Sequence, residues 1–155
     1  MSLDLKALQS FIVAAKAACY VGNGRVAEPS RPSSHDLTEV HGAWSYRDSY
    51  FGGTDFIGQE VVWYRDNPVW AMNYYGYILR DDLIDARLAG ATIKAALSQL
   101  YKEDRFLGGF EWQGPHGVYC DISSGDVGHF AGTETITVDG TLAYRLDYHG
   151  GLIRP

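Results

Sequence analysis

The stretch Phe56-Ile57-Gly58-Gln59-Glu60 returns 74 residues later as Phe130-Ala131-Gly132-Thr133-Glu134. The stretch Tyr74-Tyr75-Gly76 returns at the same offset as Tyr148-His149-Gly150. Self-similarity at one fixed spacing is the sequence signature of a repeated structural unit. We therefore predict a single domain, residues 1–155, built from two pseudo-repeats at about 4–79 and 82–153.

Each predicted repeat begins with an amphipathic helix. The first covers residues 4–20, and the second follows Asp82 and Asp85, which resemble a capping pair, and ends before Gly108-Gly109. The apolar residues at helical spacing are Leu5, Leu8, Ile12, Ala15 and Cys19 in the first helix, and Ala86, Ala89, Ile93, Leu97 and Leu100 in the second. Residues 21–34, rich in Gly, Pro and Ser, are predicted to form a loop.

Four predicted strands follow each helix. They cover about 36–41, 43–51, 56–64 and 69–78 in the first repeat, and about 109–113, 117–123, 129–138 and 141–149 in the second. Helices segregated from runs of antiparallel strands indicate an α+β fold. The predicted architecture is an internal duplication of a helix plus a four-stranded antiparallel unit, with two helices packed on a curved antiparallel sheet. One long sheet and two smaller ones both remain open.

The alternation of side chains along a strand places both repeated glutamates on an apolar face. Glu134 shares a face with Phe130 and Ile136, and Glu60 shares one with Phe56 and Val62. A three-residue loop around Gly140 would keep Tyr144, Leu146 and Tyr148 on the face of Glu134. Glycines 58, 76, 132 and 150 are predicted to mark bulges or tight bends.

These faces predict an inward pocket with aromatic walls. Trp44, Tyr50, Trp70 and Tyr74 would line it, and Asp48 and Glu60 would be its polar groups. Asp48 aligns with Ile122 at the common offset, so we expect this acid to have no counterpart in the second repeat.

The alternative is that the repeated glutamates are structural. Each would accept hydrogen bonds from a tyrosine hydroxyl or from backbone amides, because a buried carboxylate is costly unless it is paired or hydrogen-bonded. Duplication favours this structural role for Glu134 and Tyr148, and leaves both roles open for Glu60.

The segment Ser30-Arg31-Pro32-Ser33-Ser34-His35-Asp36 is a second candidate for ligand contact. Arg31 could bind an anion and His35 could transfer a proton at the mouth of the pocket. The alternative is a turn held by local hydrogen bonds of Ser and Asp side chains.

Composition excludes several classes of function. The net charge of −6 argues against direct nucleic-acid binding, and no apolar run is long enough to span a membrane. Cys19 and Cys120 stand alone, and the histidines and aspartates are too dispersed for a recognisable metal site, so we expect no metal and no cofactor. With no signal peptide evident, we expect a cytoplasmic protein. All four lysines (Lys6, Lys16, Lys94 and Lys102) are expected on solvated helix faces.

Residues 30–37, Tyr46-Arg47-Asp48-Ser49-Tyr50-Phe51-Gly52, residues 56–60 and residues 68–76 resemble a bacterial family of domains of unknown function, number 5680. The resemblance implies no activity and no catalytic residues. Members of that family occur alone or fused to an Xre-type helix-turn-helix. That fusion pattern favours ligand sensing by analogy, although this chain carries no such DNA-binding module.

Three functions fit the sequence. The favoured one is a small-molecule-binding or sensor domain whose pocket uses Arg31 and His35 at the mouth and Asp48, Tyr50, Glu60, Trp70 and Tyr74 inside. The second is a protein-interaction or assembly domain with exposed Trp63 or Trp112, for which a homodimer is one arrangement. The third is a small hydrolase or isomerase with Glu60 or Asp48 as a catalytic carboxyl group. The sequence does not decide whether the protein is an enzyme.

Overall fold

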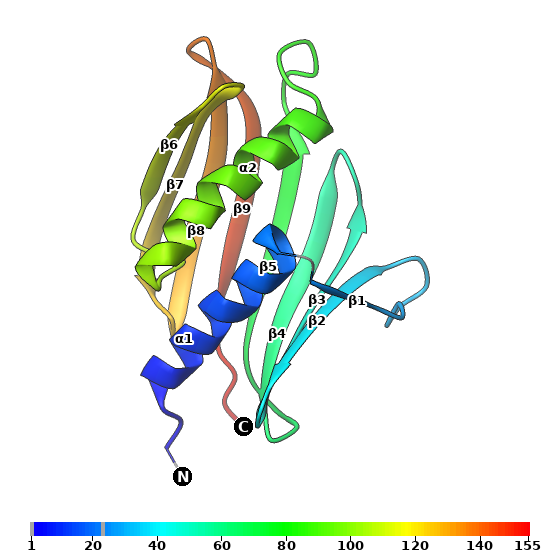
Figure 1. The fold of residues 1–155 in the computed structure, drawn as a ribbon, viewed down its shortest axis with the longest axis vertical. Coiled ribbons are helices and arrows are strands. Elements are labelled where there is room, and N and C mark those ends of the chain that lie inside the picture. The colour runs from blue at the N-terminus through cyan, green and yellow to red at the C-terminus, as the bar shows by residue number, and fades with distance from the viewer. Residues whose placement is uncertain (1, 23) are drawn as a thin grey trace.

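The computed structural model describes residues 2–22 and 24–155. They form one antiparallel sheet in which nine strands follow the order β1-β2-β3-β4-β5-β9-β8-β7-β6. Two helices, α1 and α2, lie across the same face of this sheet (Figure 1). No helix in the described ranges is long and apolar enough to cross a membrane.

The helical segments agree with the apolar periodicity. Helix α1 covers Leu5–Lys16 and continues as a π-helical turn, η1, at Ala17–Val21. Helix α2 covers Ala86–Leu100 and is followed by a 3₁₀ turn, η2, at Tyr101–Glu103. Asp4 and Asp85 cap the two helices by accepting hydrogen bonds from backbone amides of the first turn. Asp82 takes no part in the cap and pairs with Arg80 instead.

The strands of the first half are β1 (Arg25–Ala27), β2 (His35–His41), β3 (Trp44–Gly52), β4 (Phe56–Tyr64) and β5 (Asn67–Ile78). Those of the second half are β6 (Phe110–Gly114), β7 (Gly117–Asp126), β8 (His129–Val138) and β9 (Thr141–Leu152). The predicted architecture of two equal units with four strands each is therefore wrong, although the class remains α+β. Part of the predicted loop 21–34 is β1, which pairs with β2 at the sheet edge.

The two halves meet where β5 pairs with β9. Tyr74 lies directly opposite Tyr148 in this pairing, and both rings are buried. The division into two pseudo-repeats stays a prediction, but the repeated tyrosines mark the centre of the sheet.

The register of β8 against β9 confirms the predicted faces, but the hairpin that produces it differs from the predicted one. The turn between β8 and β9 has two residues, Asp139 and Gly140, and a bulge at Ile136/Thr137 supplies the extra residue that restores the register. Leu146 consequently lies opposite Glu134 and on the same face. The β4–β5 hairpin uses the same device, with a two-residue turn and a bulge at Val62/Trp63.

The four repeated glycines do not sit at these bulges. Gly58, Gly76 and Gly132 make room for aromatic side chains, and Gly150 lies against Ala71 and Met72. A methyl group at Gly58 would collide with the ring and hydroxyl of Tyr74, and one at Gly132 would collide with those of Tyr148. Gly76 faces the ring of Phe56 in the same way. The prediction of bulges or bends at these glycines is therefore wrong, because the bulges lie four residues further along β4 and β8.

Candidate ligand-binding site

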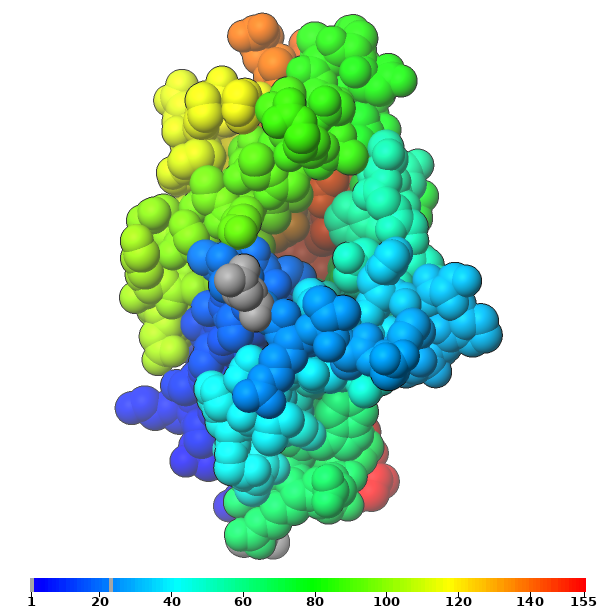
Figure 2. All heavy atoms as spheres, turned by 45° about the vertical axis from the view of Figure 1, so that its right-hand side comes forward, coloured from blue at the N-terminus to red at the C-terminus, as the bar shows by residue number. Residues whose placement is uncertain are grey.

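A cavity of about 460 Å³ lies between α2, the end of α1 and the helix-covered face of the sheet. Figure 2 shows the hollow between α2, in green, and the β3–β4 hairpin, in cyan, with β9 visible at its floor in red. Its walls are mostly apolar, and two pairs of acidic residues line it. The apolar side chains include Phe56, Met72, Ile78, Ala89, Ile93, Leu97, Phe106 and Leu146.

The first acid pair is Asp48 and Glu60, which face each other on neighbouring strands β3 and β4. Their exposed fractions are 0% and 2%. Lys16, the last residue of α1, reaches this pair and places its Nζ 2.7 Å from Glu60 Oε2 and 3.0 Å from Oε1. The expectation that Lys16 lies on a solvated face is wrong, since its exposed fraction is 5%.

Two tyrosine hydroxyls complete the first cluster. Tyr74 donates to Asp48 Oδ1 at 2.6 Å. The hydroxyl of Tyr20 lies within hydrogen-bond distance of both Asp48 Oδ2 and Glu60 Oε1. A hydroxyl carries one proton, so both contacts are satisfied only when one carboxyl group is also protonated. Burial, together with the charge of Glu60, raises the pKa of Asp48 to about 7.

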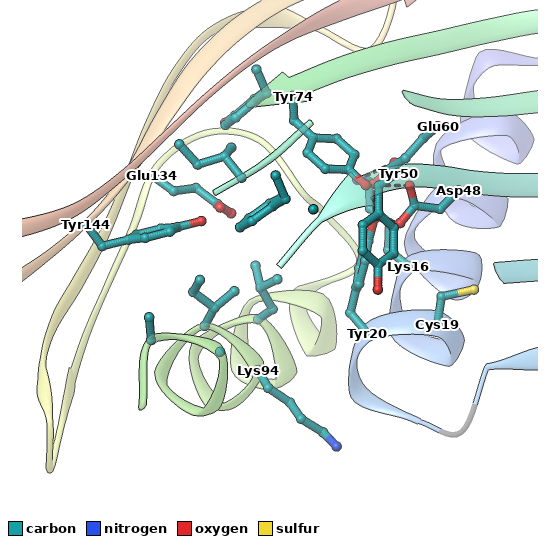
Figure 3. A pocket seen from close by; sticks show the side chains of 18 of the residues that line it. Lys16, Cys19, Tyr20, Asp48, Tyr50, Glu60, Tyr74, Lys94, Glu134 and Tyr144 are labelled. Carbon is teal, nitrogen blue, oxygen red and sulfur yellow. Dashed lines mark hydrogen bonds and ion pairs between the residues drawn. The ribbon is translucent and has the colours of Figure 1, made fainter. Parts of the chain in front are cut away.

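Tyr20 lies in the π-helical turn η1, which places its hydroxyl beside the two carboxyl groups. Lys16 and Tyr20 are four residues apart, and both side chains reach Glu60 (Figure 3). Turns of this kind occur frequently at functional sites. Cys19, in the same turn, also borders the cavity, but burial raises the pKa of its thiol to about 12, which keeps it protonated and unreactive.

The second acid pair is Asp121 and Glu134, which face each other on β7 and β8. Tyr148 donates to Asp121 at 2.7 Å, and Tyr119 donates to Glu134 at 2.7 Å. Burial raises the pKa of Asp121 to about 6. Burial and the charge of Asp121 raise the pKa of Glu134 to about 7.

Asp121 is therefore the counterpart of Asp48, and the expectation that Asp48 has none is wrong. Asp48 accepts from Tyr74 and lies opposite Glu60, just as Asp121 accepts from Tyr148 and lies opposite Glu134. The common offset missed it because the β3–β4 loop has three residues, 53–55, whereas the β7–β8 loop has two, 127 and 128. Because the β7–β8 loop is one residue shorter, the residue opposite Glu134 is Asp121 and not Ile122.

Tyr144 is a further polar group at the cavity. Its exposed fraction is 1%, and its hydroxyl has no hydrogen-bond partner among the described residues. In Figure 3 this hydroxyl is directed towards the carboxyl group of Glu134, on the side of the cavity away from Lys16. A buried hydroxyl without a partner is costly, so this group calls for an explanation.

The structure brings some of the predicted pocket residues together and separates others. Asp48, Tyr50, Glu60 and Tyr74 line the cavity, as does Glu134. Trp70 does not, because its indole is fully buried, donates to the Val127 carbonyl oxygen and stacks on Phe130. Trp44 also lies elsewhere and stacks on Phe11 of α1.

The predicted mouth residues lie outside the cavity lining. Arg31 donates to the carbonyl oxygen and the hydroxyl of Ser49 and lies over the ring of Phe51. His35 is exposed and packs beside the ring of Tyr50. Ser34 donates to Asp36, which matches the alternative of a turn held by local hydrogen bonds. A role for Arg31 and His35 in ligand binding stays a prediction.

The sequence analysis named none of five further residues as part of the pocket, although it placed Tyr144 on the face of Glu134. The five, all of which line the cavity, are Lys16, Tyr20, Tyr101, Asp121 and Tyr144. A signal for Lys16 was present, because it follows Ile12 by four residues and Leu8 by eight and so lies on the apolar stripe of α1. Within the described ranges, no three His, Cys, Asp or Glu side chains are grouped in a way that could hold a metal ion.

Comparison with models of known protein families identifies the family of this chain. The model of a family described as a domain of unknown function (DUF5680) matches residues 48–153, which include both acid pairs. No curated protein and no solved structure matches the chain.

Proposed function

The chain belongs to the DUF5680 family of domains of unknown function, and we propose that it binds a small, largely apolar organic molecule in the cavity beneath α2. The volume of about 460 Å³ supports this proposal, because sites for small molecules typically enclose about 300–1,000 Å³ with apolar walls and a few placed polar groups. This cavity is the single observation that carries the proposal.

The buried acids support the same conclusion. Three carboxyl groups that line the cavity, those of Asp48, Asp121 and Glu134, have raised pKa values because burial disfavours their charged forms. A protein selected for stability alone would gain by replacing such groups with apolar ones. Perturbed acids gathered in one cleft are typical of functional sites.

A thermal-shift screen with fragment-sized amines, alcohols and acids tests the proposal. A ligand present at 100 times its dissociation constant should stabilise the fold by about 2.7 kcal/mol, or roughly 5–10 °C. A variant that fills the cavity tests whether the compounds bind there. Gly90 of α2 lines the cavity, and a side chain added there meets no atom within 4 Å, so Gly90→Leu should fold and block binding.

The matched control is Ala91→Leu, which adds the same side chain on the exposed side of the helix, outside the cavity lining. Compounds that stabilise the wild type and Ala91→Leu but not Gly90→Leu would support the cavity as the binding site. Compounds that stabilise all three proteins equally, or a screen without any stabilising compound, would overturn the proposal.

A second candidate function is proton-transfer catalysis on the bound molecule. The observation that favours it is Asp48, whose pKa of about 7 lets it give or take a proton near neutral pH at the edge of the cavity. Asp48→Asn keeps the shape of the side chain and removes the titration. Turnover of a cavity ligand that Asp48→Asn abolishes, while binding persists, would establish catalysis. Unchanged turnover in that variant would exclude Asp48 as the catalytic group.

A further inference from the structure

The two acid pairs share a plan but differ in the charge beside them. Each pair lies across two neighbouring strands, and each aspartate accepts a hydrogen bond from one of the two tyrosines that face each other at the β5–β9 junction. Glu60 of the first pair has the ammonium of Lys16 at 2.7 Å. In the described part of the chain, neither Asp121 nor Glu134 forms an ion pair.

The helix that covers the second pair brings no replacement for Lys16. Leu97 and Tyr101 have the same four-residue spacing as Lys16 and Tyr20, and they line the cavity from α2 and η2. Lys94 is the charged residue of α2 in the lining, and its ammonium points away from the cavity (Figure 3). The charge of Lys16 lowers the pKa of both Asp121 and Glu134, but its ammonium forms its ion pair with Glu60. Arg105 also lowers the pKa of Asp121, but its guanidinium is bonded to Glu103 and to the carbonyl oxygens of Leu107 and Gly109.

The hydroxyl of Tyr144 is an independent sign of a missing partner. It is buried and unpaired among the described residues, it lines the cavity, and it is directed towards Glu134. A polar ligand atom at this point would complete its hydrogen bonding, which the chain does not do.

We propose that the cavity selects a primary amine, whose ammonium group binds between Asp121, Glu134 and the hydroxyl oxygen of Tyr144. An ammonium group has three N–H donors, which match one acceptor from each of these three side chains. The apolar body of the ligand would lie against Ile93, Leu97 and Phe106. This inference rests on the proposed function and specifies the chemical class of its ligand.

The charge balance of the cavity supports an amine over an acid. Four carboxyl groups (Asp48, Glu60, Asp121 and Glu134) line the cavity, and Lys16 is the inward-facing cation among the described lining residues. An anionic ligand would have to be buried beside these groups, where the repulsion between like charges is only weakly screened. A ligand ammonium supplies the second cluster with the charge that Lys16 supplies to the first.

Phenylalkylamines from phenethylamine to phenylhexylamine test the proposal, each compared with the alcohol and the carboxylate of the same chain length. Isothermal titration calorimetry is expected to give dissociation constants at least about tenfold lower for the amine than for the alcohol. The carboxylate is expected not to bind. Glu134→Gln should weaken amine binding by about tenfold or more and change alcohol binding by less than about twofold.

Two further variants separate charge recognition from folding. Tyr144→Phe removes a hydroxyl that has no partner in the free protein, so it should leave the melting temperature unchanged or raise it, and weaken amine binding by about threefold to tenfold. Glu111→Gln removes the same charge as Glu134→Gln from an exposed position on β6 and should leave amine binding unchanged.

The outcomes distinguish this inference from the proposed function. If alcohols bind in the cavity as tightly as amines, and Gly90→Leu blocks both, the cavity binds ligands but the amine proposal is overturned. Amine binding that survives Glu134→Gln unchanged would overturn it equally. If the amines, the alcohols and every compound of the wider screen fail to bind, both proposals fall.

Discussion

The ammonium of Lys16 and the carboxylate of Glu60 lie 2.7 Å apart, and both side chains are almost completely buried. Two charges removed from water in this way are stable only together, because an unpaired buried charge loses its hydration without compensation. This pair also joins the end of α1 to the centre of the sheet, so it links the position of the helix to the wall of the cavity.

We predict that Lys16→Met lowers the free energy of unfolding by about 3–5 kcal/mol, because it leaves Glu60 buried without its partner. Urea denaturation at neutral pH measures this change. The double variant Lys16→Met/Glu60→Gln removes both charges and should recover most of the loss. Lys94→Met, on the exposed face of α2, is the control and should change stability by less than about 0.5 kcal/mol. A loss below about 1 kcal/mol for Lys16→Met would contradict a buried ion pair.

Stability should fall as the pH rises from about 5 to about 8. The pKa values of Asp48, Asp121 and Glu134 are raised in the folded state to about 7, 6 and 7. Between their unfolded and folded pKa values, the folded protein binds more protons than the unfolded chain does. A rise in pH therefore favours unfolding, by about 1.4 kcal/mol per pH unit for each proton of difference.

Asp36 should affect stability in the opposite direction and at lower pH than the cavity acids. Burial alone would raise the pKa of Asp36, but hydrogen bonds from serines lower it to about 2, so its contribution is lost only below about pH 4. Denaturant unfolding at several pH values measures the slope, and Asp48→Asn/Glu134→Gln should flatten it above pH 5. Stability that rises from pH 5 to pH 8 in the wild type would contradict the pKa values of the cavity acids.

Removing the Tyr20 hydroxyl should destabilise the protein and change its pH response. Tyr20→Phe leaves Asp48 and Glu60 without the hydroxyl between them, at an expected cost of about 1–3 kcal/mol. It should also raise the pKa of Asp48 further, because a hydrogen bond to its charged form is lost. Tyr50→Phe, at a cavity tyrosine without a hydrogen bond among the described residues, is the matched control. Equal melting curves for the two variants at pH 6 and pH 8 would rule out the bridging role.

Replacing Gly58 or Gly132 by alanine should destabilise the protein. Gly58→Ala and Gly132→Ala would each force a methyl group into a tyrosine ring, and we expect each to cost about 1–3 kcal/mol in thermal or urea unfolding. Gly53→Ala, in the β3–β4 loop with no atom within 4 Å of the added methyl group, should be nearly neutral. Alanine tolerated at position 58 as well as at position 53 would show that Tyr74 is not held against β4.

Local patterns were enough to predict most elements and the face of each glutamate. Strand alternation depends on neighbouring residues, so the inward direction of Glu60 and Glu134 could be read from the sequence before their partners were known. The predicted three-residue loop was wrong, yet Leu146 still shares a face with Glu134 because a bulge supplies the missing residue. The core requires an apolar side chain at this position, and the backbone places Leu146 there by means of a bulge and not by means of a longer loop.

Side-chain periodicity over a few residues was sufficient to predict the helices, most strands, the α+β class and the inward faces of the repeated Phe-x-Gly-x-Glu and tyrosine motifs. The tertiary structure alone decided that nine strands form one sheet in the described chain, that Asp121 is the counterpart of Asp48 and that Tyr144 is left without a partner. It also placed Lys16, and not Arg31 or His35, at the acids of the cavity. These features depend on loop length, on bulges and on which helix face meets the sheet. Such relations join residues far apart in the chain, so no local pattern records them.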